Sequence, residues 1–372
     1  MTKNNGKIQV FFAGGGTGGH IYPAIAAAQK IRKLAPETVI HFLCSQSPID
    51  ANILSKTEFE YTALPARGFA LHPVKILNFI LNQRKSRNIV SQVLTEKSVI
   101  VGIGGYVSAP AVAAAKKKSL PVCLINVDYV PGKSNRLMAS KTDKIFCQYQ
   151  ATAGMFTNTN AKIFVTGCPM REEFETPRPE KIISEYNLSP DKSTLLVTGA
   201  SSGALNINIA METLLPRLES FADNWQVLHL SGRGKDTRLK DAAAKARIEY
   251  RVVDYCDNIW DMYSCADIVI GRAGAVSIAE YTYYRKPFIC LPYPYHKDNH
   301  QQLNAIELEK AGACLIVEDM KEDRNATAEN IWQKLEPLLS NKGIREQMSE
   351  KTAGIAKKDA AETIASEILK LA

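Results

Sequence analysis

The sequence of 372 residues contains no apolar run of 18 residues that would span a bilayer, and its amino terminus lacks the pattern of a signal peptide. Its eight cysteines are scattered without a Cys-x-x-Cys pair, which is typical of buried free thiols rather than of a disulfide framework or a zinc site. It has no metal-ligand cluster, no closely spaced carboxylate pair suited to glycoside hydrolysis and no Ser-His-Asp order. With 45% hydrophobic and 23% charged residues, the composition predicts a globular protein of the cytosol.

Acidic residues are scarce in the first half of the chain. Residues 1–170 hold 20 Lys and Arg against 7 Asp and Glu, a net charge of +13, whereas the remainder holds 26 against 31, a net charge of −5. This asymmetry suits an anionic partner near the first half, such as nucleic acid, an anionic membrane or a phosphorylated substrate. Because the basic residues are not interleaved with aromatics and no recognition motif appears, we expect no nucleic-acid partner.

Short β-branched runs alternate with longer stretches of helical period in both halves. This rhythm predicts an α/β protein with two Rossmann-like, doubly wound domains, 1–168 and 169–354, joined by a linker rich in Pro and charge at 167–181. A carboxyl-terminal helix within 355–372 is expected to pack back on the first domain. Ligands are expected at the carboxyl ends of the strands, in a cleft between the domains. The expected strands are 8–13, 39–44, 99–102, 121–126, 144–147 and 162–167, then 193–199, 225–232, 250–253, 267–271, 287–292 and 314–317.

The first glycine turn lies between an expected strand and an expected helix. Gly14, Gly16 and Gly19 satisfy G-x-G-x-x-G, which suggests a dinucleotide site, but no acid follows the second strand until Asp50. No Lys-Ser/Thr follows the glycines either, which excludes a P-loop. His20 stands where the helix begins, where the helix dipole favours a neutral imidazole that can accept a proton; a histidine that only caps the turn is the alternative.

A second glycine turn, 102–110, follows another strand of the first half. The two turns together can hold a phosphate or let a bulky polar group approach the backbone, although a tight strand-to-helix turn is equally compatible with the second.

The second half repeats the strand, glycine turn and helix arrangement twice. Ser201 can add a hydroxyl donor to a diphosphate at a helix start, and Glu280 can accept from both hydroxyls of a ribose. Gln301 and Asn304 stand three apart on one helix face, where they can bind a sugar. For Glu280, Gln301 and Asn304 the alternative is a solvated side chain on a helix surface. Together with the glycine turns, however, these residues indicate a nucleotide-sugar site.

Five segments, GGTGGHIYPA, GIGGYVSAPAVAAA, GCPMR, GRAGAVSIAE and HQQLNAIELEKAGA, resemble in order and spacing the bacterial MurG glycosyltransferases, of GT-B fold. The resemblance implies an inverting hexosyltransferase that moves N-acetylglucosamine from UDP-N-acetylglucosamine to the 4-hydroxyl of lipid I. The product, with a β-1,4 bond, would be lipid II of peptidoglycan synthesis, which serves cell wall biogenesis, cell shape and cell division. Helix dipoles and Arg171 can stabilise the leaving UDP, so no metal and no cofactor is expected.

The resemblance also implies roles for single residues. His20 and Asp128 would be the catalytic candidates. The acceptor diphosphate would lie on Gly15, Gly16, Thr17, Gly104, Gly105 and Tyr106. The donor would lie on Thr17, Gly18, Gly19, His20, Asp128, Arg171, Ser201, Cys256, Ala275, Val276, Ser277, Glu280, Gln301 and Asn304.

The sequence departs from the family pattern at three places. The usual His-Glu-Gln-Asn segment reads INVD, so Asp128 stands where an asparagine is expected, and this aspartate competes with His20 as the candidate base. The usual Gly-Gly-Ser-x-Gly loop reads GASSG. A serine expected after Arg272 is Ala273, which removes one possible hydroxyl donor.

An amphipathic stretch suggests how the enzyme reaches a lipid-borne acceptor. In 72–90, apolar residues stand beside Arg84, Lys85 and Arg87, as in a helix that lies on an anionic membrane. An ordinary amphipathic core helix is the alternative. The expectation is a peripheral protein at the cytoplasmic face of the cell membrane, with contacts through Lys75, Ile76, Leu77, Phe79 and Ile80.

Other functions share parts of these patterns. A glycolipid synthase or a UDP-N-acetylglucosamine 2-epimerase shares the second-half pattern, and a non-catalytic sugar-nucleotide sensor needs no base. A nicotinamide-dependent oxidoreductase could use the first glycine turn, but the acid after the second strand is missing.

Overall fold

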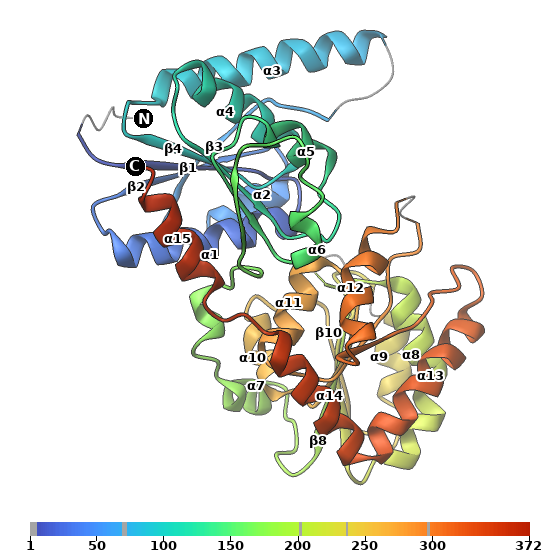
Figure 1. The fold of residues 1–372 in the computed structure, drawn as a ribbon. Helices are drawn as coiled ribbons and strands as arrows, with labels where there is room; N and C mark the ends of the chain where they lie inside the picture. Colours follow the sequence, from blue (N-terminus) through green and yellow to red (C-terminus); the bar gives the residue numbers. More distant parts are fainter. Residues whose placement is uncertain (1–5, 69–72, 201–202, 236, 296–297) are drawn as a thin grey trace. The chain divides into compact units, whose positions relative to one another are not determined.

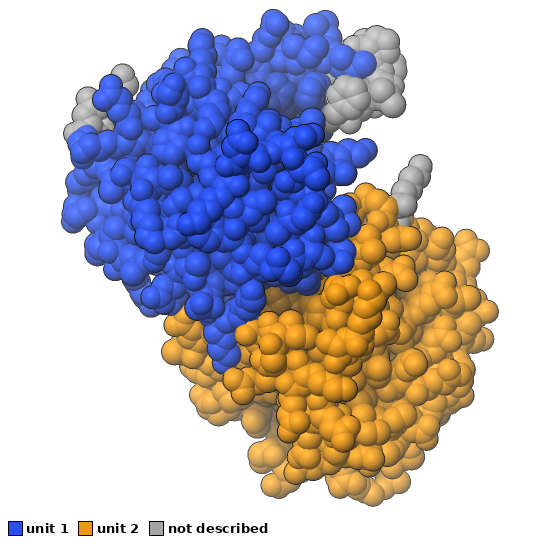
Figure 2. Space-filling view, in the orientation of Figure 1, with its two compact units in different colours: residues 1–172, 357–372 blue, residues 173–356 orange. Residues whose placement is uncertain are grey.

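The computed structural model describes residues 6–68, 73–200, 203–235, 237–295 and 298–372 (Figure 1). The chain divides into two compact units, coloured separately in Figure 2: unit 1 comprises residues 1–172 with 357–372, and unit 2 comprises residues 173–356. The boundaries predicted from the sequence are 168/169 and 354/355. Because unit 1 extends to residue 172, it includes Arg171, which was expected in the donor half.

Unit 1 is built on a seven-stranded parallel sheet of order β3-β2-β1-β4-β5-β6-β7. Phe11 and Ala13 of β1 belong to a core shared with α3 and α4, so Val10 and Phe12 face the other side of the sheet. Figure 1 shows α1 and α15 on that other side. The strands are β1 Gln9–Ala13, β2 Val39–Cys44, β3 Glu60–Ala63, β4 Ser98–Gly102, β5 Val122–Asn126, β6 Lys144–Cys147 and β7 Lys162–Val165. The helices are α1 Gly18–Leu34, α2 Pro48–Leu54, α3 Pro73–Val93, α4 Gly105–Lys117, α5 Lys133–Ala139, α6 Gln150–Ala153, η1 Glu172–Phe174, which crosses into unit 2, and α15 Ala360–Leu369.

The carboxyl-terminal helix α15 belongs to unit 1 and packs on α1. Its Glu367 forms an ion pair of 2.8 Å with Lys144 of β6, and both side chains are largely buried. The Lys144 ammonium also donates to the Glu367 carbonyl at 2.8 Å, so the end of the chain is held on the first sheet by two polar contacts as well as by apolar packing.

Unit 2 repeats the plan with a six-stranded parallel sheet of order β10-β9-β8-β11-β12-β13. Its main core lies between the sheet and α8, α9 and α13. The strands are β8 Ser193–Thr198, β9 Trp225–Leu230, β10 Tyr250–Val253, β11 Ile268–Gly271, β12 Phe288–Cys290 and β13 Cys314–Ile316. The helices are α7 Pro179–Glu185, α8 Leu205–Leu218, η3 Glu219–Phe221, α9 Thr237–Ala243, α10 Ile259–Cys265, α11 Ala275–Tyr283, α12 His300–Lys310, α13 Arg324–Ser340 and α14 Lys342–Ile355.

The predicted fold class is confirmed, since both units are doubly wound α/β layers. In each sheet the strand order reverses once, between β1 and β4 and between β8 and β11, and the two loops that leave such a switch point form a crevice at the strand ends. The sequence prediction missed β3, an edge strand with mostly exposed side chains. All eight cysteines are free; six are buried, and Cys256 and Cys265 are half-buried.

Candidate active site

The first glycine loop is held by a buried carboxylate. Asp50, at the start of α2, is fully buried and accepts from the Gly16 amide at 2.8 and 2.9 Å, from the Ser45 amide at 2.9 Å and from the Ser45 hydroxyl at 2.6 Å. A side chain on Gly15 would collide with this carboxylate, and Gly16 has a φ of +91°. The Gly16 N–H therefore has an internal acceptor in Asp50, and the expected contact of Gly16 with the acceptor diphosphate stays a prediction.

His20 lies in the first turn of α1 with a defined hydrogen-bond direction. Its Nδ1 is 3.1 Å from the Gly15 carbonyl oxygen and 3.3 Å from the Thr17 hydroxyl. Because a carbonyl oxygen only accepts, this contact places a proton on Nδ1, and in the neutral imidazole the lone pair is then on Nε2. A side chain added to Gly104 would come within 3.3 Å of Nε2, so Nε2 faces the second glycine loop.

The second loop joins β4 to α4 and packs directly on the first. Its Gly104 and Gly105 have φ of +115° and +75°, values that side chains rarely adopt. The buried Ser108 hydroxyl lies 2.6 Å from the Ala13 carbonyl and 2.7 Å from the Gly104 carbonyl, and it accepts from the Gly104 amide at 3.1 Å. A side chain on Gly16 would come within 3.8 Å of the Tyr106 hydroxyl. The structure thus brings the two predicted glycine loops, His20 and Tyr106 together.

Asp128 follows β5, the strand next to β4, and its backbone carbonyl accepts from Asn126 Nδ2 at 2.6 Å. Asn126 in turn accepts from Asn135 Nδ2 at 2.9 Å. Asn135 is 4% exposed, and among the described residues its Oδ1 has no hydrogen-bond partner. Sequence reasoning missed Asn135, Ser108 and the role of Asp50, because each has a hydrogen-bond partner on another element of the fold.

Arg171 lies in unit 1, where its guanidinium stacks 4.2 Å above the ring of Tyr22 of α1. Its expected contact with the donor diphosphate stays a prediction.

In unit 2, α11 begins at the switch point with Gly274 as its N-cap, so Ala275, Val276 and Ser277 present the first backbone amides of the helix. Glu280, one turn further, is 7% exposed and accepts from the Tyr263 hydroxyl at 3.1 Å. A buried carboxylate held by a neutral donor suits the predicted contact with a ribose, which stays a prediction.

Two polar side chains of α12 hold the loop before α11. Gln301 Oε1 accepts from the amides of Ala273 at 3.2 Å and Tyr293 at 2.9 Å. Asn304 Nδ2 donates to the Ala273 carbonyl at 3.3 Å. Since the Gln301 oxygen is bound to backbone, only its NH₂ can serve a sugar hydroxyl.

Two further residues, Cys256 and Ser201, were expected to bind the sugar donor. Burial raises the pKa of the Cys256 thiol to about 11, so this side chain stays a neutral thiol near neutral pH. The contact that the family resemblance implies here is between the backbone around Cys256 and the uracil of the donor, and it stays a prediction. Ser201 lies outside the described residues. No group of three or more His, Cys, Asp or Glu that could hold a metal occurs in the described ranges.

Helix α3 presents apolar side chains on its surface: Leu77 is 58% exposed, Ile80 41% and Leu81 51%, whereas Ile76 and Phe79 are half-buried. The side chain of Lys75 lies outside the described part of the structure. In the portion described, no helix is long and apolar enough to cross a membrane. Gln83 Nε2 of α3 donates to the Tyr106 carbonyl at 3.2 Å, which connects this helix to the second glycine loop.

Two doubly wound units, each with glycine-rich turns at its switch point, form the GT-B fold. Residues 10–147 match the N-terminal domain of glycosyltransferase family 28, and residues 194–364 match its C-terminal domain. The chain belongs to this family, which confirms the resemblance stated from the sequence.

Similarity to known proteins extends along nearly the full chain. The UDP-N-acetylglucosamine–N-acetylmuramyl-(pentapeptide) pyrophosphoryl-undecaprenol N-acetylglucosamine transferase of Bacteroides fragilis is 34% identical and covers 100% of this chain and 99% of its own. The crystal structure of Acinetobacter baumannii MurG has a TM-score of 0.75 at 21% identity, covering 98% of this chain and 99% of that chain. The crystal structure of the UDP-N-acetylglucosamine 2-epimerase from Neisseria meningitidis has a TM-score of 0.69 at 13% identity, covering 98% of this chain and 100% of that chain. The fold alone therefore does not separate transferases from epimerases.

Proposed function

We propose that this chain transfers N-acetylglucosamine from UDP-N-acetylglucosamine to lipid I and so produces lipid II. The observation that carries the proposal is the full-length similarity to transferases that have this activity in their name, at 31 to 34% identity. Unit 1 would hold the acceptor on its two glycine loops, and unit 2 would hold the donor between α11 and α12.

His20 has the geometry of a general base. The muramoyl 4-hydroxyl attacks the anomeric carbon, the bond to the UDP oxygen breaks with inversion, and the hydroxyl proton moves to His20 Nε2. The Gly15 carbonyl, 3.1 Å from Nδ1, orients the ring and stabilises the imidazolium that forms. The amides at the start of α11 would stabilise the charge that develops on the leaving diphosphate.

A turnover assay with UDP-N-acetylglucosamine and a short-chain lipid I analogue tests the proposal. We expect His20→Ala to lower kcat by about 10²- to 10⁴-fold, the usual contribution of a general base, while UDP affinity and thermal stability stay near those of wild type. For Asp128→Asn we expect a changed acceptor KM with kcat retained.

Absence of transfer by wild-type protein would refute the assignment. Unchanged turnover in His20→Ala would remove the proposed base, and a collapse of kcat in Asp128→Asn would move that role to Asp128. Incubation with the donor alone separates the epimerase alternative, because only an epimerase inverts the 2-carbon of the sugar without an acceptor.

We propose further that unit 1 docks peripherally on the anionic cytoplasmic face of the membrane through α3. The exposed Leu77 and Leu81 offer apolar area, and the exposed Arg84 and Lys85 on the same helix offer charge. Burial of one leucine contributes about 1.5–3 kcal/mol, so the double change to serine should weaken binding to phosphatidylglycerol vesicles by at least about tenfold. Asn88→Ser on the same helix is the matched control. Vesicle binding that is unchanged in the folded double variant would refute this docking mode.

A further inference from the structure

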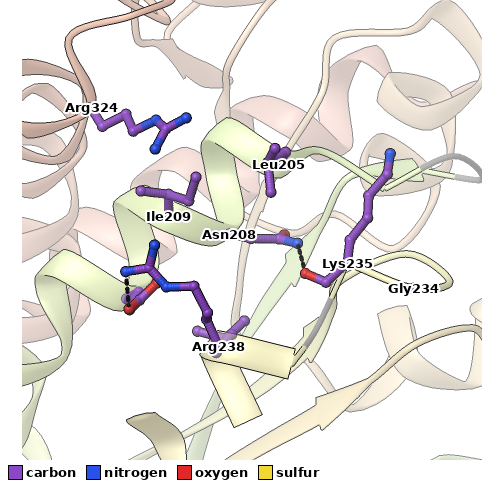
Figure 3. A pocket seen from close by; sticks show the side chains of 9 residues that line it. Leu205, Asn208, Ile209, Gly234, Lys235, Arg238 and Arg324 are labelled. Atoms are coloured by element: carbon purple, nitrogen blue, oxygen red, sulfur yellow. Dashed lines mark hydrogen bonds and ion pairs between the residues drawn. The ribbon is translucent and has the colours of Figure 1, made fainter. Parts of the chain in front are cut away.

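A cavity of about 310 Å³ lies in unit 2 over one face of α8 (Figure 3). Its apolar walls come from Leu205 and Ile209 of α8 and from Leu239 of α9. Leu205 is 50% exposed although it stands in the first turn of the helix beside this hollow. The volume is at the lower end of the range of small-molecule sites, which suits a ligand with one ring and not a dinucleotide.

Cations dominate the polar part of the lining. Lys235, Arg238 and Arg324 come from three different segments, and the single carboxylate, Glu212, pairs with Arg238 at 3.0 Å. Figure 3 shows Lys235, Arg238 and Arg324 on different sides of the cavity. One carboxylate against three cations leaves an excess of positive charge, which attracts an anion.

Arg324 is an exposed side chain at the end of a helix that disfavours a cation. It is the first residue of α13, and the positive end of the helix dipole disfavours a cation there. Asp323 caps the helix by accepting from the Ala326 amide at 2.9 Å, and no hydrogen bond or ion pair of the Arg324 side chain occurs within the part of the chain described. An arginine in this position gains a partner when an anion enters the cavity.

Hydrogen bonds from Asn208 of α8 hold the loop that carries Lys235. Asn208 Nδ2 donates to the carbonyls of Ser231 and Lys235, each at 3.0 Å, and Asn208 Oδ1 lies 3.0 Å from His229 Nε2. His229 Nδ1 lies 2.7 Å from the Tyr250 hydroxyl, and burial lowers the pKa of His229 to about 3, so this network stays neutral. The cavity wall is therefore preformed, which reduces the free energy lost on ordering when a ligand binds.

We propose that this cavity is a binding site for a small organic phosphate, separate from the donor site. The phosphate would lie between Lys235 and Arg324, and the ring of the ligand would lie against Leu205 and Ile209. The Lys235 ammonium is also 3.4 Å from the carbonyl of Gly203, in the turn that follows β8.

Pyridoxal phosphate is a suitable probe, because it combines one ring, a phosphate and an aldehyde that forms an imine with a lysine amine. After reduction with borohydride, peptide mapping by mass spectrometry gives a rate of modification for each lysine. Lys240, which is exposed on α9 but does not line the cavity, is an internal control. We expect Lys235 to react about tenfold faster than Lys240, since one charge-assisted contact is worth about that factor, and inorganic phosphate should protect only Lys235.

In Arg324→Ala the rate at Lys235 should fall toward that of Lys240, with an unchanged circular dichroism spectrum. Equal rates at the two lysines in wild type, or no protection by phosphate, would overturn the proposal. Saturating UDP should leave the Lys235 rate unchanged; protection by UDP would instead make the cavity part of the donor site and overturn the claim that it is separate. This experiment does not depend on transferase activity, so its failure is distinguishable from failure of the proposed function.

Discussion

Replacement of the buried Asp50 should loosen the first glycine loop and destabilise unit 1 selectively. Its carboxylate accepts from three donors, the amides of Gly16 and Ser45 and the Ser45 hydroxyl, at 2.6 to 2.9 Å, and none of its surface is exposed. Hydrogen bonds to a charged group contribute about 1.5–3 kcal/mol each. Because Asp50→Ala leaves these three donors without an acceptor, we expect a loss of at least about 4 kcal/mol in the free energy of unfolding of unit 1.

Asp50→Asn should cost less, about 2 kcal/mol, because the amide oxygen can still accept from Ser45 while the NH₂ group opposes the Gly16 N–H. Glu58→Ala is the control for the loss of an acid near the same helix. Glu58 is exposed and 3.7 Å from Arg32, so the change should cost less than about 1 kcal/mol.

The positions of the tryptophans allow the two units to be followed separately. All three, Trp225, Trp260 and Trp332, lie in unit 2. In urea unfolding, Asp50→Ala should therefore move the circular dichroism transition but leave the tryptophan fluorescence transition near its wild-type midpoint, and hydrogen exchange should accelerate in β1 and α1. A free energy within about 1 kcal/mol of wild type would refute the assignment of Asp50 as the anchor of the loop.

Two further predictions concern one residue in each unit. Glu280→Gln should raise the KM for UDP-N-acetylglucosamine by about 10- to 100-fold with kcat nearly unchanged, because a neutral amide binds ribose hydroxyls more weakly than a carboxylate. Tyr263→Phe is the control, since it removes only the hydrogen bond of 3.1 Å between Tyr263 and Glu280. An unchanged KM in Glu280→Gln would exclude the ribose contact. For Glu367, the hydrogen bonds from Lys144 and then Lys370 lower the pKa from 4.5 to about 2, so its stabilising contribution is complete above about pH 4.5 and is lost as the pH falls toward 2. Circular dichroism should show that Glu367→Gln removes part of this acid sensitivity, and identical pH profiles of variant and wild type would contradict it.

Much of the fold follows from local sequence. Buried parallel strands read as short β-branched runs, and glycines at the strand ends mark the turns, so all six strands of unit 2 and six of the seven in unit 1 overlap predicted segments. The exception, β3, is a four-residue edge strand whose side chains are mostly exposed and therefore carry no apolar signal. The candidate loops could be located for the same reason, since the conformations of Gly104 and Gly105 depend on the absence of a side chain.

The partners of the polar groups were decided by the tertiary structure. Asp50 was noted in the sequence only as an acid too late to bind a ribose, whereas in the fold it occupies the Gly16 amide 34 residues away. Gln301 was expected to contact a sugar, and in the fold its oxygen accepts from backbone amides of two loops, so its NH₂ group remains for that contact. Local sequence sets the conformation of a segment; which donor meets which acceptor depends on how distant segments pack, and buried polar groups take whichever partner that packing provides.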